Sequence, residues 1–216
     1  MSENQTDETT GTLVVGTFLT LDGVMQAPGG PDEDRDGGFK HGGWSVNYWD
    51  EKMGEIMDGQ FAEIDTLLLG RKTYEIFAAH WPTVDGDDDP VAAKLNSMPK
   101  YVASRSLETV EWNNSMLLAG DVAEAVADLK EESGGEILVQ GSGDLIQTLL
   151  QHDLIDEFRL WIFPLVLGTG KRLFGDGTVP AALQLTDVET SSTGVQILRY
   201  KRAGEIDYGS FALEDQ

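Results

Sequence analysis

The pattern of apolar and polar positions predicts alternating strands and helices along most of the chain. Residues 12–20, TLVVGTFLT, form a short β-branched apolar run that ends at Leu21-Asp22-Gly23, which is typical of a buried first strand and a turn. Residues 45–60 carry apolar side chains at helical spacing and predict an amphipathic helix. Further strands are predicted at 66–69, 100–103 and 136–140, and further helices at 73–79, 91–96, 121–131 and 144–152.

Strands that recur between helices predict an α/β fold with a central, mainly parallel sheet and helices on both faces. The last third of the chain departs from this alternation. Residues 156–167, 183–191 and 195–202 form three apolar runs without intervening helices, and Ser192-Thr193-Gly194 is typical of a hairpin turn. We therefore expect a mixed sheet whose C-terminal strands form an antiparallel edge.

The length and composition predict one domain. A chain of 216 residues with 40% hydrophobic residues can bury one sizeable core, which we expect to span residues 12–202. The polar residues 1–11 are expected to form a disordered acidic tail, and residues 203–216 a C-terminal tail.

One connection is unusually long. Residues 27–44, APGGPDEDRDGGFKHGGW, are rich in Gly and Asp and exceed the length of a simple connection. The segment is therefore either a functional loop over a site or a disordered insertion.

The charge of the chain is strongly negative. Lys and Arg total 15 against 38 Asp and Glu, which gives a formal net charge of -23. This field repels polyanions, so no nucleic-acid partner is expected. Because the acidic residues are dispersed along the chain, they favour adaptation to high salt; an ordinary acidic mesophilic protein is the alternative.

The absence of cysteine excludes disulfides, thiolate nucleophiles and Cys-ligated zinc, and it fits a reducing cytoplasm. His41, His80 and His152 lie far apart without a metal-binding spacing, so no metal is expected. No apolar run approaches the roughly 20 residues of a membrane-spanning helix. The sequence predicts a soluble, cytoplasmic protein without a membrane partner.

The segment Gly70-Arg71-Lys72-Thr73 follows a predicted strand and begins a predicted helix. A glycine lets a phosphate approach the backbone, the helix start offers free N–H groups, and the two cations add charge. The alternative is an ordinary helix start with Thr73 in its first turn.

Two more strand ends carry polar groups. Gly141-Ser142-Gly143 lies between a predicted strand and a helix, and Ser104-Arg105 follows a third strand. A GxG sequence alone is a weak signal, but several such turns at the carboxyl ends of parallel strands indicate a ligand crevice. An arginine there can bind a ribose 2′-phosphate and so select NADPH over NADH.

Taken together, the segments TFLTLDGVM, LLLGRKTYE, VASRS, ILVQGSGDLI and LIDEFRLWIFPLVLGTGKRLF resemble, in order and spacing, the dihydrofolate reductase superfamily. They are most similar to the reductase domain of riboflavin biosynthesis and its stand-alone relatives. The resemblance covers residues 12–202. It implies a dihydrofolate reductase-like three-layer fold, NADPH bound across the strand ends, and hydride transfer to a ring C=N or to a sugar imine or carbonyl.

The resemblance also implies which residues contact the cofactor. The phosphates would meet Gly70, Arg71, Lys72 and Thr73, and the 2′-phosphate would meet Ser104 and Arg105. The diphosphate and the nicotinamide ribose would lie over Gly141, Ser142, Gly143, Asp144 and Leu145. The nicotinamide would be flanked by Thr17 and Phe18, with Asp22, Gly23 and Met25 in the loop beside it.

On the substrate side, the resemblance implies contacts with Trp44, Pro164, Gly168, Gly170, Lys171 and Phe174. For the proton that accompanies hydride transfer, Asp22 is one candidate; its alternative role is a turn-forming Asp before Gly. Asp50, Glu51 and Glu55 on the first helix are the others, and the sequence singles out none of them. The zinc deaminase domain of the bifunctional riboflavin enzyme has a Cys pair that this chain lacks.

These observations predict an NADPH-dependent reductase of a small heterocyclic or sugar-linked metabolite, pterin-like or ribosylaminopyrimidine-like. The alternative is a non-catalytic nucleotide-binding homodimer or sensor that retains the fold. A homodimer is expected in either case.

Overall fold

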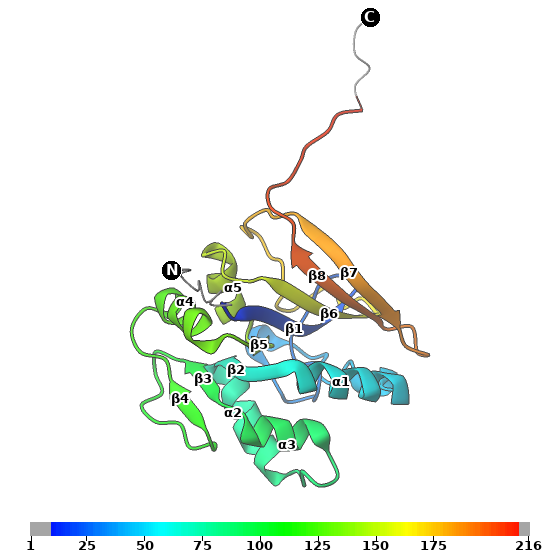
Figure 1. The fold of residues 1–216 in the computed structure, drawn as a ribbon. Coiled ribbons are helices and arrows are strands. Elements are labelled where there is room, and N and C mark those ends of the chain that lie inside the picture. The colour runs from blue at the N-terminus through cyan, green and yellow to red at the C-terminus, as the bar shows by residue number, and fades with distance from the viewer. Residues whose placement is uncertain (1–9, 212–216) are drawn as a thin grey trace, which may run out of the picture.

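The computed structural model describes residues 10–211, and an eight-stranded sheet crosses the whole of this region (Figure 1). The strands lie in the order β4-β3-β2-β5-β1-β6-β8-β7. All pairs from β4 to β6 are parallel, whereas β8 pairs antiparallel with both β6 and β7. The predicted mixed sheet with an antiparallel C-terminal edge is confirmed. The strand bounds are β1 (Thr12–Thr20), β2 (Ile64–Gly70), β3 (Lys100–Ala103), β4 (Ser115–Leu117), β5 (Glu136–Gln140), β6 (Glu157–Phe163), β7 (Leu183–Thr190) and β8 (Gln196–Arg202).

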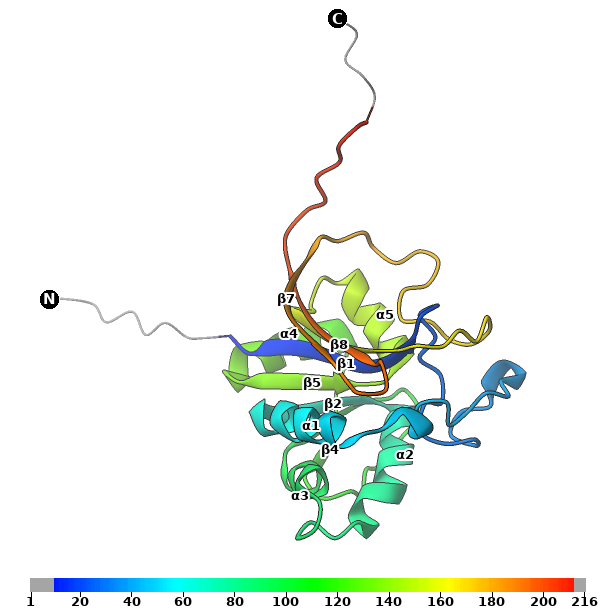
Figure 2. The same ribbon diagram turned by 90° about the vertical axis from the view of Figure 1, so that its right-hand side faces the viewer.

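Helices cover both faces of the sheet, as predicted (Figure 2). On one face lie α1 (Glu51–Glu63), α2 (Arg71–His80) and α3 (Pro90–Ser97); on the other lie α4 (Val122–Ser133) and α5 (Gly143–Gln151). Alternate side chains of a strand point to opposite faces, so Val14 of β1 packs with α1, α2 and α3, while Val15 packs with α4 and α5. The middle of most parallel strands is apolar, as at 13–15, 67–69 and 137–139, because both faces of the sheet are covered there.

Helix α1 begins later than the apolar spacing predicts. Asp50 is its N-cap and its Oδ1 accepts a hydrogen bond from the Met53 backbone N–H at 2.8 Å. Residues Val46–Tyr48 form a separate 3-10 turn, so the apolar side chains at 46 and 49 are not on the helix. The predicted helix start at residue 45 is therefore wrong, because a capping Asp ends the preceding turn.

The structure also contains elements that the sequence pattern did not reveal. Strand β4 has three residues, too few to show a periodicity, and it forms by pairing with β3. The long loop 27–44 is ordered, with a short 3-10 turn at Asp36–Gly38 and a buried Phe39. It is therefore not a disordered insertion.

At its ends, the chain extends beyond the sheet. Gly11 is buried and its N–H donates to the Lys130 carbonyl at 2.6 Å, so packing begins one residue before the predicted boundary. The rest of the predicted N-terminal tail falls largely on residues 1–9, which lie outside the described residues. Residues 203–211 continue away from β8 (Figure 1). Within residues 10–211, no helix is long and apolar enough to cross a membrane.

Candidate functional site

A cavity of about 850 Å³ opens at the carboxyl ends of β1, β2, β3 and β5. Open parallel sheets bind ligands at this edge, and the volume falls within the usual range of small-molecule sites. Apart from Asp22 and Gly23, all the positions for which the resemblance implies cofactor contact line this cavity. They are Thr17, Phe18, Met25, Gly70, Arg71, Lys72, Thr73, Ser104, Arg105, Gly141, Ser142, Gly143, Asp144 and Leu145. The tertiary fold therefore brings together segments that lie far apart in the sequence.

Two helices begin at the cavity without a side-chain cap. The N-cap of α2 is Gly70, which has no side chain, and the N-cap of α5 is Ser142, whose side chain accepts no hydrogen bond from its helix. In contrast, α1, α3 and α4 are each capped by an aspartate, at Asp50, Asp89 and Asp121. An uncapped helix start leaves backbone N–H groups and the positive end of the helix dipole available to an anion. Both uncapped starts face the same cavity.

The turns that precede these two helices are joined by hydrogen bonds. The Gly70 N–H donates to Ser142 Oγ at 2.9 Å, and the Ser142 N–H donates to Thr73 Oγ1 at 3.1 Å. Ser142 Oγ in turn donates to the Gln140 carbonyl at 3.0 Å. The side chains of Ser142 and Thr73 thus hold the two turns at a set distance instead of capping their own helices.

The backbone of the second turn is left-handed. Gly141 has φ +55° and Ser142 has φ 61°, a region that favours glycine. A Cβ on Gly141 would lie 3.5 Å from Thr73 Oγ1, which is ordinary contact, so the constraint at this position is the backbone conformation. The turn therefore presents bare backbone to the cavity.

Four cations line the cavity, and three of them are already paired. Arg71 pairs with Glu75 at 3.1 Å on its own helix. Lys72 and Lys171 each pair with both Asp34 and Asp36 of the long loop. Arg105 forms no ion pair with any residue of the described chain. Arg105 is thus the lining cation available to an anionic ligand without displacing a carboxylate.

The ion pairs of the long loop shift the pKa values of Asp34, Asp36 and Lys171. Burial opposes the charge of Asp34, but hydrogen bonds from Lys171, the Asp36 amide and Lys72 outweigh it and lower its pKa. The Lys72 and Lys171 ammonium groups lower the pKa of Asp36 to about 2. Burial works against the charge of Lys171 too, yet its bonds to both carboxylates raise its pKa. Asp34, Asp36 and Lys171 are therefore charged at neutral pH, and the ion pairs of the two aspartates tie the loop to α2 and to the segment after β6.

Glu33 is the cavity-lining carboxyl whose pKa is raised. Burial disfavours its charged form, and this outweighs the hydrogen bonds that its Oε2 accepts from the Gly29 and Gly30 amides at 2.6 and 3.1 Å. Sequence reasoning missed Glu33 because it lies among several other acids of an irregular loop. A carboxyl group with a raised pKa at the wall of a cavity can donate a proton.

One face of α1 lines the cavity, and the sequence pattern did not identify its residues as part of a site. Gly54, Met57, Asp58 and Phe61 line it at helical spacing. The signal was present, because positions 54, 57, 58 and 61 share one face of a helix, but it depends on knowing which face meets the site. Trp49 adds an aromatic wall, stacked on Trp161 with centroids 5.8 Å apart.

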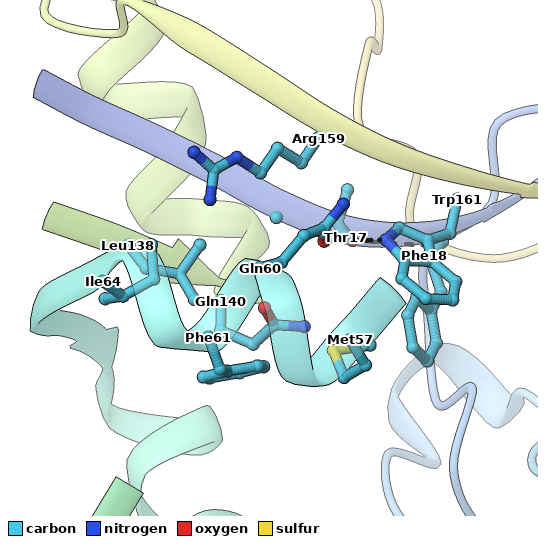
Figure 3. A pocket seen from close by; sticks show the side chains of 11 residues that line it. Thr17, Phe18, Met57, Gln60, Phe61, Ile64, Leu138, Gln140, Arg159 and Trp161 are labelled. Atoms are coloured by element: carbon cyan, nitrogen blue, oxygen red, sulfur yellow. Dashed lines mark hydrogen bonds between the residues drawn. The ribbon is translucent and has the colours of Figure 1, made fainter. Parts of the chain in front are cut away.

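A second, very small cavity of about 10 Å³ lies under β1 (Figure 3). Its wall includes Gln60, Gln140 and the buried Arg159, and Figure 3 shows Gln60 beside Trp161, whose Nε1 donates to Gln60 Oε1 at 3.3 Å. Arg159 donates to Glu157 and Glu136, each at 2.7 Å, whereas its Nη1 has no hydrogen-bond partner within the protein. The volume is that of about one water molecule.

The three predicted catalytic carboxylates, Asp22, Asp50 and Glu51, do not line the main cavity. Asp22 accepts hydrogen bonds from Thr20 Oγ1 at 2.5 Å and from the Gly168 amide at 2.8 Å, and it pairs with Arg172. The Thr20 hydrogen bond is the largest of the contacts that lower the pKa of Asp22 to about 2. A group this acidic is ionised at neutral pH and cannot serve as the proton donor, so the geometry supports the turn role.

Asp50 and Glu51 are likewise placed away from the cavity. Asp50 caps α1 with one oxygen and accepts hydrogen bonds from the Ser192 amide and hydroxyl, at 2.7 and 2.6 Å, with the other. The Ser192 hydroxyl is the main cause of its lowered pKa. Glu51 is exposed in the first turn of α1, and Glu55 is exposed one turn later. Asp50 and Glu51 are thus absent from the wall of the main cavity, and their catalytic roles stay predictions.

Of the predicted substrate contacts, Lys171 lines the cavity and the others do not. Trp44 is buried against Phe163 and donates its Nε1 to the Gln26 carbonyl at 2.8 Å. Gly170 has φ +122°, and a Cβ there would lie 2.6 Å from Val24 Cγ1, so its role is close packing. Pro164 lies near Gly194 in the turn between β7 and β8, Gly168 donates to Asp22, and Phe174 packs on Phe158.

One family model matches most of the chain. Residues 11–197 match the family model of the RibD C-terminal domain. The chain belongs to this family. Over 190 residues, or 87% of this chain and 93% of the relative, it is 30% identical to the uncharacterized protein YyaP of Bacillus subtilis (strain 168).

Solved structures support the same fold for this RibD C-terminal domain. The crystal structure of a protein from Shewanella sp. PV-4, assigned to riboflavin biosynthesis, is similar to this chain with a TM-score of 0.67 and 24% identity. The match covers 88% of this chain and 98% of the Shewanella chain. Dihydrofolate reductase from Enterococcus faecalis, complexed with NADP(H), matches 90% of this chain and 98% of its own, with a TM-score of 0.57 and 13% identity. The dihydrofolate reductase-like fold is thereby confirmed. Members of the family are typically NADPH-dependent reductases.

Proposed function

We propose that this RibD C-terminal domain is an NADPH-dependent reductase that transfers a hydride to a small heterocyclic or sugar-linked metabolite, pterin-like or ribosylaminopyrimidine-like. The observation that carries the proposal is the pair of uncapped helix starts, α2 and α5, that face one cavity across interlocked turns. A diphosphate needs several N–H donors on bare backbone, which this arrangement supplies.

The residues present fit the cofactor. The turn around Gly141 would hold the diphosphate, with Lys72 as a nearby cation, and the unpaired Arg105 would hold the 2′-phosphate. Thr17 and Phe18 of β1 would flank the nicotinamide. When bound, NADPH supplies the hydride, and the protein contributes position and electrostatics.

The chain's own residues would complete the reaction. The apolar wall of Met57, Phe61 and Trp49 excludes water from the acceptor carbon. Glu33, with its raised pKa, would donate the proton to the atom that gains negative charge as the hydride arrives. A proton donor with a raised pKa requires its protonated form, so turnover should fall as the pH rises through the pKa of Glu33.

The test measures NADPH binding and turnover separately. NADPH titrated into the protein should saturate one site per chain, and NADPH oxidation should be followed with pterin, ribosylaminopyrimidine and flavin acceptors. Glu33→Gln should reduce turnover by about 100-fold or more with little change in NADPH affinity. The control, Glu55→Gln, changes an exposed carboxyl of α1 and should leave both unchanged. Absence of NADPH binding would overturn the proposal.

A second candidate function is a non-catalytic nucleotide-binding protein or sensor. It is favoured by one observation, that the carboxylates nearest to β1 and to the start of α1 make structural contacts outside the cavity. Saturable NADPH binding without oxidation across all acceptor classes would support it over the reductase.

We also propose that the chain forms a homodimer. Strand β7 lies at the sheet edge and exposes Leu185 and Val188, about half of each side chain. Light scattering on the purified protein measures this directly, and a monomeric mass at all concentrations would contradict it.

A further inference from the structure

The part of the cavity between α1, α2 and α3 differs in chemistry from the part at the strand ends. Its wall contains three aromatic side chains, Phe61 of α1, Phe77 of α2 and Trp81 just beyond α2. It also contains three carboxylates, Asp58 of α1 and Asp88 and Asp89 before α3. We call these six residues the helix arm of the cavity.

The lining cations all lie elsewhere. They are placed at the first turn of α2, after β3, and on the segment after β6. Lys72 and Lys171 are held there by Asp34 and Asp36, and Arg71 by Glu75. Among the residues that line the described cavity, none in the helix arm is basic. The rest of the cavity wall carries both signs of charge, because Glu33, Asp34 and Asp144 line it as well, whereas the charged side chains of the helix arm are all acidic.

The helix arm continues from the end where chemistry would occur. Met57 and Phe61 line both the main cavity and the small chamber under β1, next to Thr17 and Phe18. A ligand ring placed against β1 would therefore have its substituent directed along α1 toward Asp58 and Trp81. This part of the cavity must accommodate whatever is attached to the reacting ring.

We propose that the helix arm binds a substituent that is uncharged or cationic, such as an amine on an aromatic or heteroaromatic ring, and that it rejects a phosphate-bearing substituent. This inference rests on the proposed reductase function and narrows its substrate class. A phosphate group carries about 1.5 to 2 negative charges at neutral pH. In the helix arm it would meet three carboxylates and no cation.

Both kinds of side chain in the helix arm favour the same ligand. Aromatic rings attract a cation through the negative face of the ring, and Trp is the strongest of them. Phe77 and Trp81 lie with their centroids 6.0 Å apart in an edge-to-face arrangement. Asp89 is fixed in position because its Oδ1 accepts the Ala92 amide at 3.0 Å as the cap of α3. The arm is therefore preorganised for a flat group that carries positive charge.

The experiment uses three ligands with one ring and different charges: 6-aminomethylpterin, 6-hydroxymethylpterin and the phosphate ester of the latter. Binding to the full-length protein is measured by calorimetry in 0.1 M KCl, with and without NADPH. The amine should bind at least about tenfold more tightly than the phosphate ester, with the neutral alcohol between them. Raising KCl should reduce this ratio because the effect is electrostatic.

Matched variants assign the effect to the helix arm. The double variant Asp58→Asn and Asp88→Asn removes two of the three carboxylates and should reduce the amine-to-phosphate ratio several-fold, whereas Asp87→Asn, an exposed neighbour outside the cavity wall, should leave it unchanged. Asp58 and Asp88 are both exposed, so the double variant should fold.

Tighter binding of the phosphate ester than of the alcohol would overturn the inference, and so would a ratio that the double variant does not change. Binding of none of the three ligands would overturn it as well. NADPH titrated into the same samples reports on the reductase proposal independently, so the two failures can be told apart.

Discussion

The backbone N–H of Ser142 donates a hydrogen bond to the side-chain oxygen of Thr73 at 3.1 Å, although 69 residues separate them. The bond joins the turn after β5 to the first turn of α2. Together with the Gly70–Ser142 bond, it sets the distance between two helix starts whose N–H groups face one cavity. A site built from two separate helix termini depends on such a link, because these two bonds join the N-cap of α5 to the first turn of α2 and to its N-cap.

Thr73→Val should therefore weaken both stability and cofactor binding. Valine keeps the shape but removes the acceptor, which leaves the Ser142 N–H without its partner at a cost of about 1–2 kcal/mol in the free energy of unfolding. NADPH affinity should fall several-fold as the two turns lose their spacing. Urea denaturation and NADPH titration measure the two effects. Thr73→Ser keeps the hydroxyl and is the control; an equal loss there would show that the hydroxyl is not responsible.

Arg105 is the lining cation without an ion-pair partner in the described chain, and its substitution tests cofactor choice. If it binds the 2′-phosphate, Arg105→Ala should weaken NADPH binding by about 1.5–3 kcal/mol and leave NADH nearly unchanged. Titration with both nucleotides gives the comparison. Arg35→Ala, an exposed arginine outside the cavity wall, serves as the control. Equal losses for NADPH and NADH would contradict the 2′-phosphate role.

Asp22→Asn should lower stability and spare turnover. The carboxylate accepts hydrogen bonds from the Leu167 and Gly168 amides at 3.2 and 2.8 Å and pairs with Arg172, and an amide can replace only part of this. We expect a loss of about 1–3 kcal/mol in the free energy of unfolding. A variant of normal stability with lost turnover would instead restore the catalytic interpretation.

The same residue predicts a pH dependence. The folded pKa of Asp22, about 2, lies below its ordinary value of 3.8, so its stabilising contribution is present above about pH 4 and is lost as the pH falls toward 2. Urea denaturation between pH 5 and 2 should show a smaller acid loss for Asp22→Asn than for the unmodified protein.

Lys100 predicts a second rise in stability with pH, at alkaline pH. Its side chain is fully buried, donates to the Met98 and Asn113 carbonyls at 2.8 Å each, and lies 4.4 Å from the Trp112 ring. Burial lowers its pKa to about 8. Because the folded protein binds this proton more weakly than the unfolded chain does, the charge penalty disappears as the pH rises from about 8 to 10.5. Urea denaturation should show the protein gaining stability relative to Lys100→Met over this range; parallel curves would contradict the assignment.

The net charge of -23 predicts a response to salt. Screening of carboxylate repulsion should raise the melting temperature as KCl increases, and salt adaptation predicts that the rise continues to molar concentrations. The ion pairs of Lys72 and Lys171 should weaken in the same range, so the rise would reflect the bulk of the acidic surface. A melting temperature as high in dilute buffer as in molar KCl would remove the case for salt adaptation.

The elements with a strong local signal could be predicted from the sequence. β1 at Thr12–Thr20, β3 at Lys100–Ala103 and β5 at Glu136–Gln140 have the predicted bounds, because each contains a short apolar run, which is typical of a buried parallel strand. The strand-turn-helix segments around Gly70 and Gly141 could be predicted equally well, because glycine and hydroxyl-bearing residues between an apolar run and a helix indicate a turn. Such features depend on neighbours in the sequence.

The sequence by itself determined the order of strands and helices, the glycine turns and the charge, because each depends on residues that are adjacent in the chain. The sequence did not determine which carboxylates face the cavity. That depends on the orientation of the helices and the conformation of the loops, and both are determined by tertiary packing. Asp50 accepts a hydrogen bond from the Ser192 amide of a distant hairpin, and Asp22 accepts one from the Gly168 amide. In contrast, Asp58 and Glu33 line the cavity. Only the tertiary structure decided this, because a side chain's partners across the fold are absent from its local sequence.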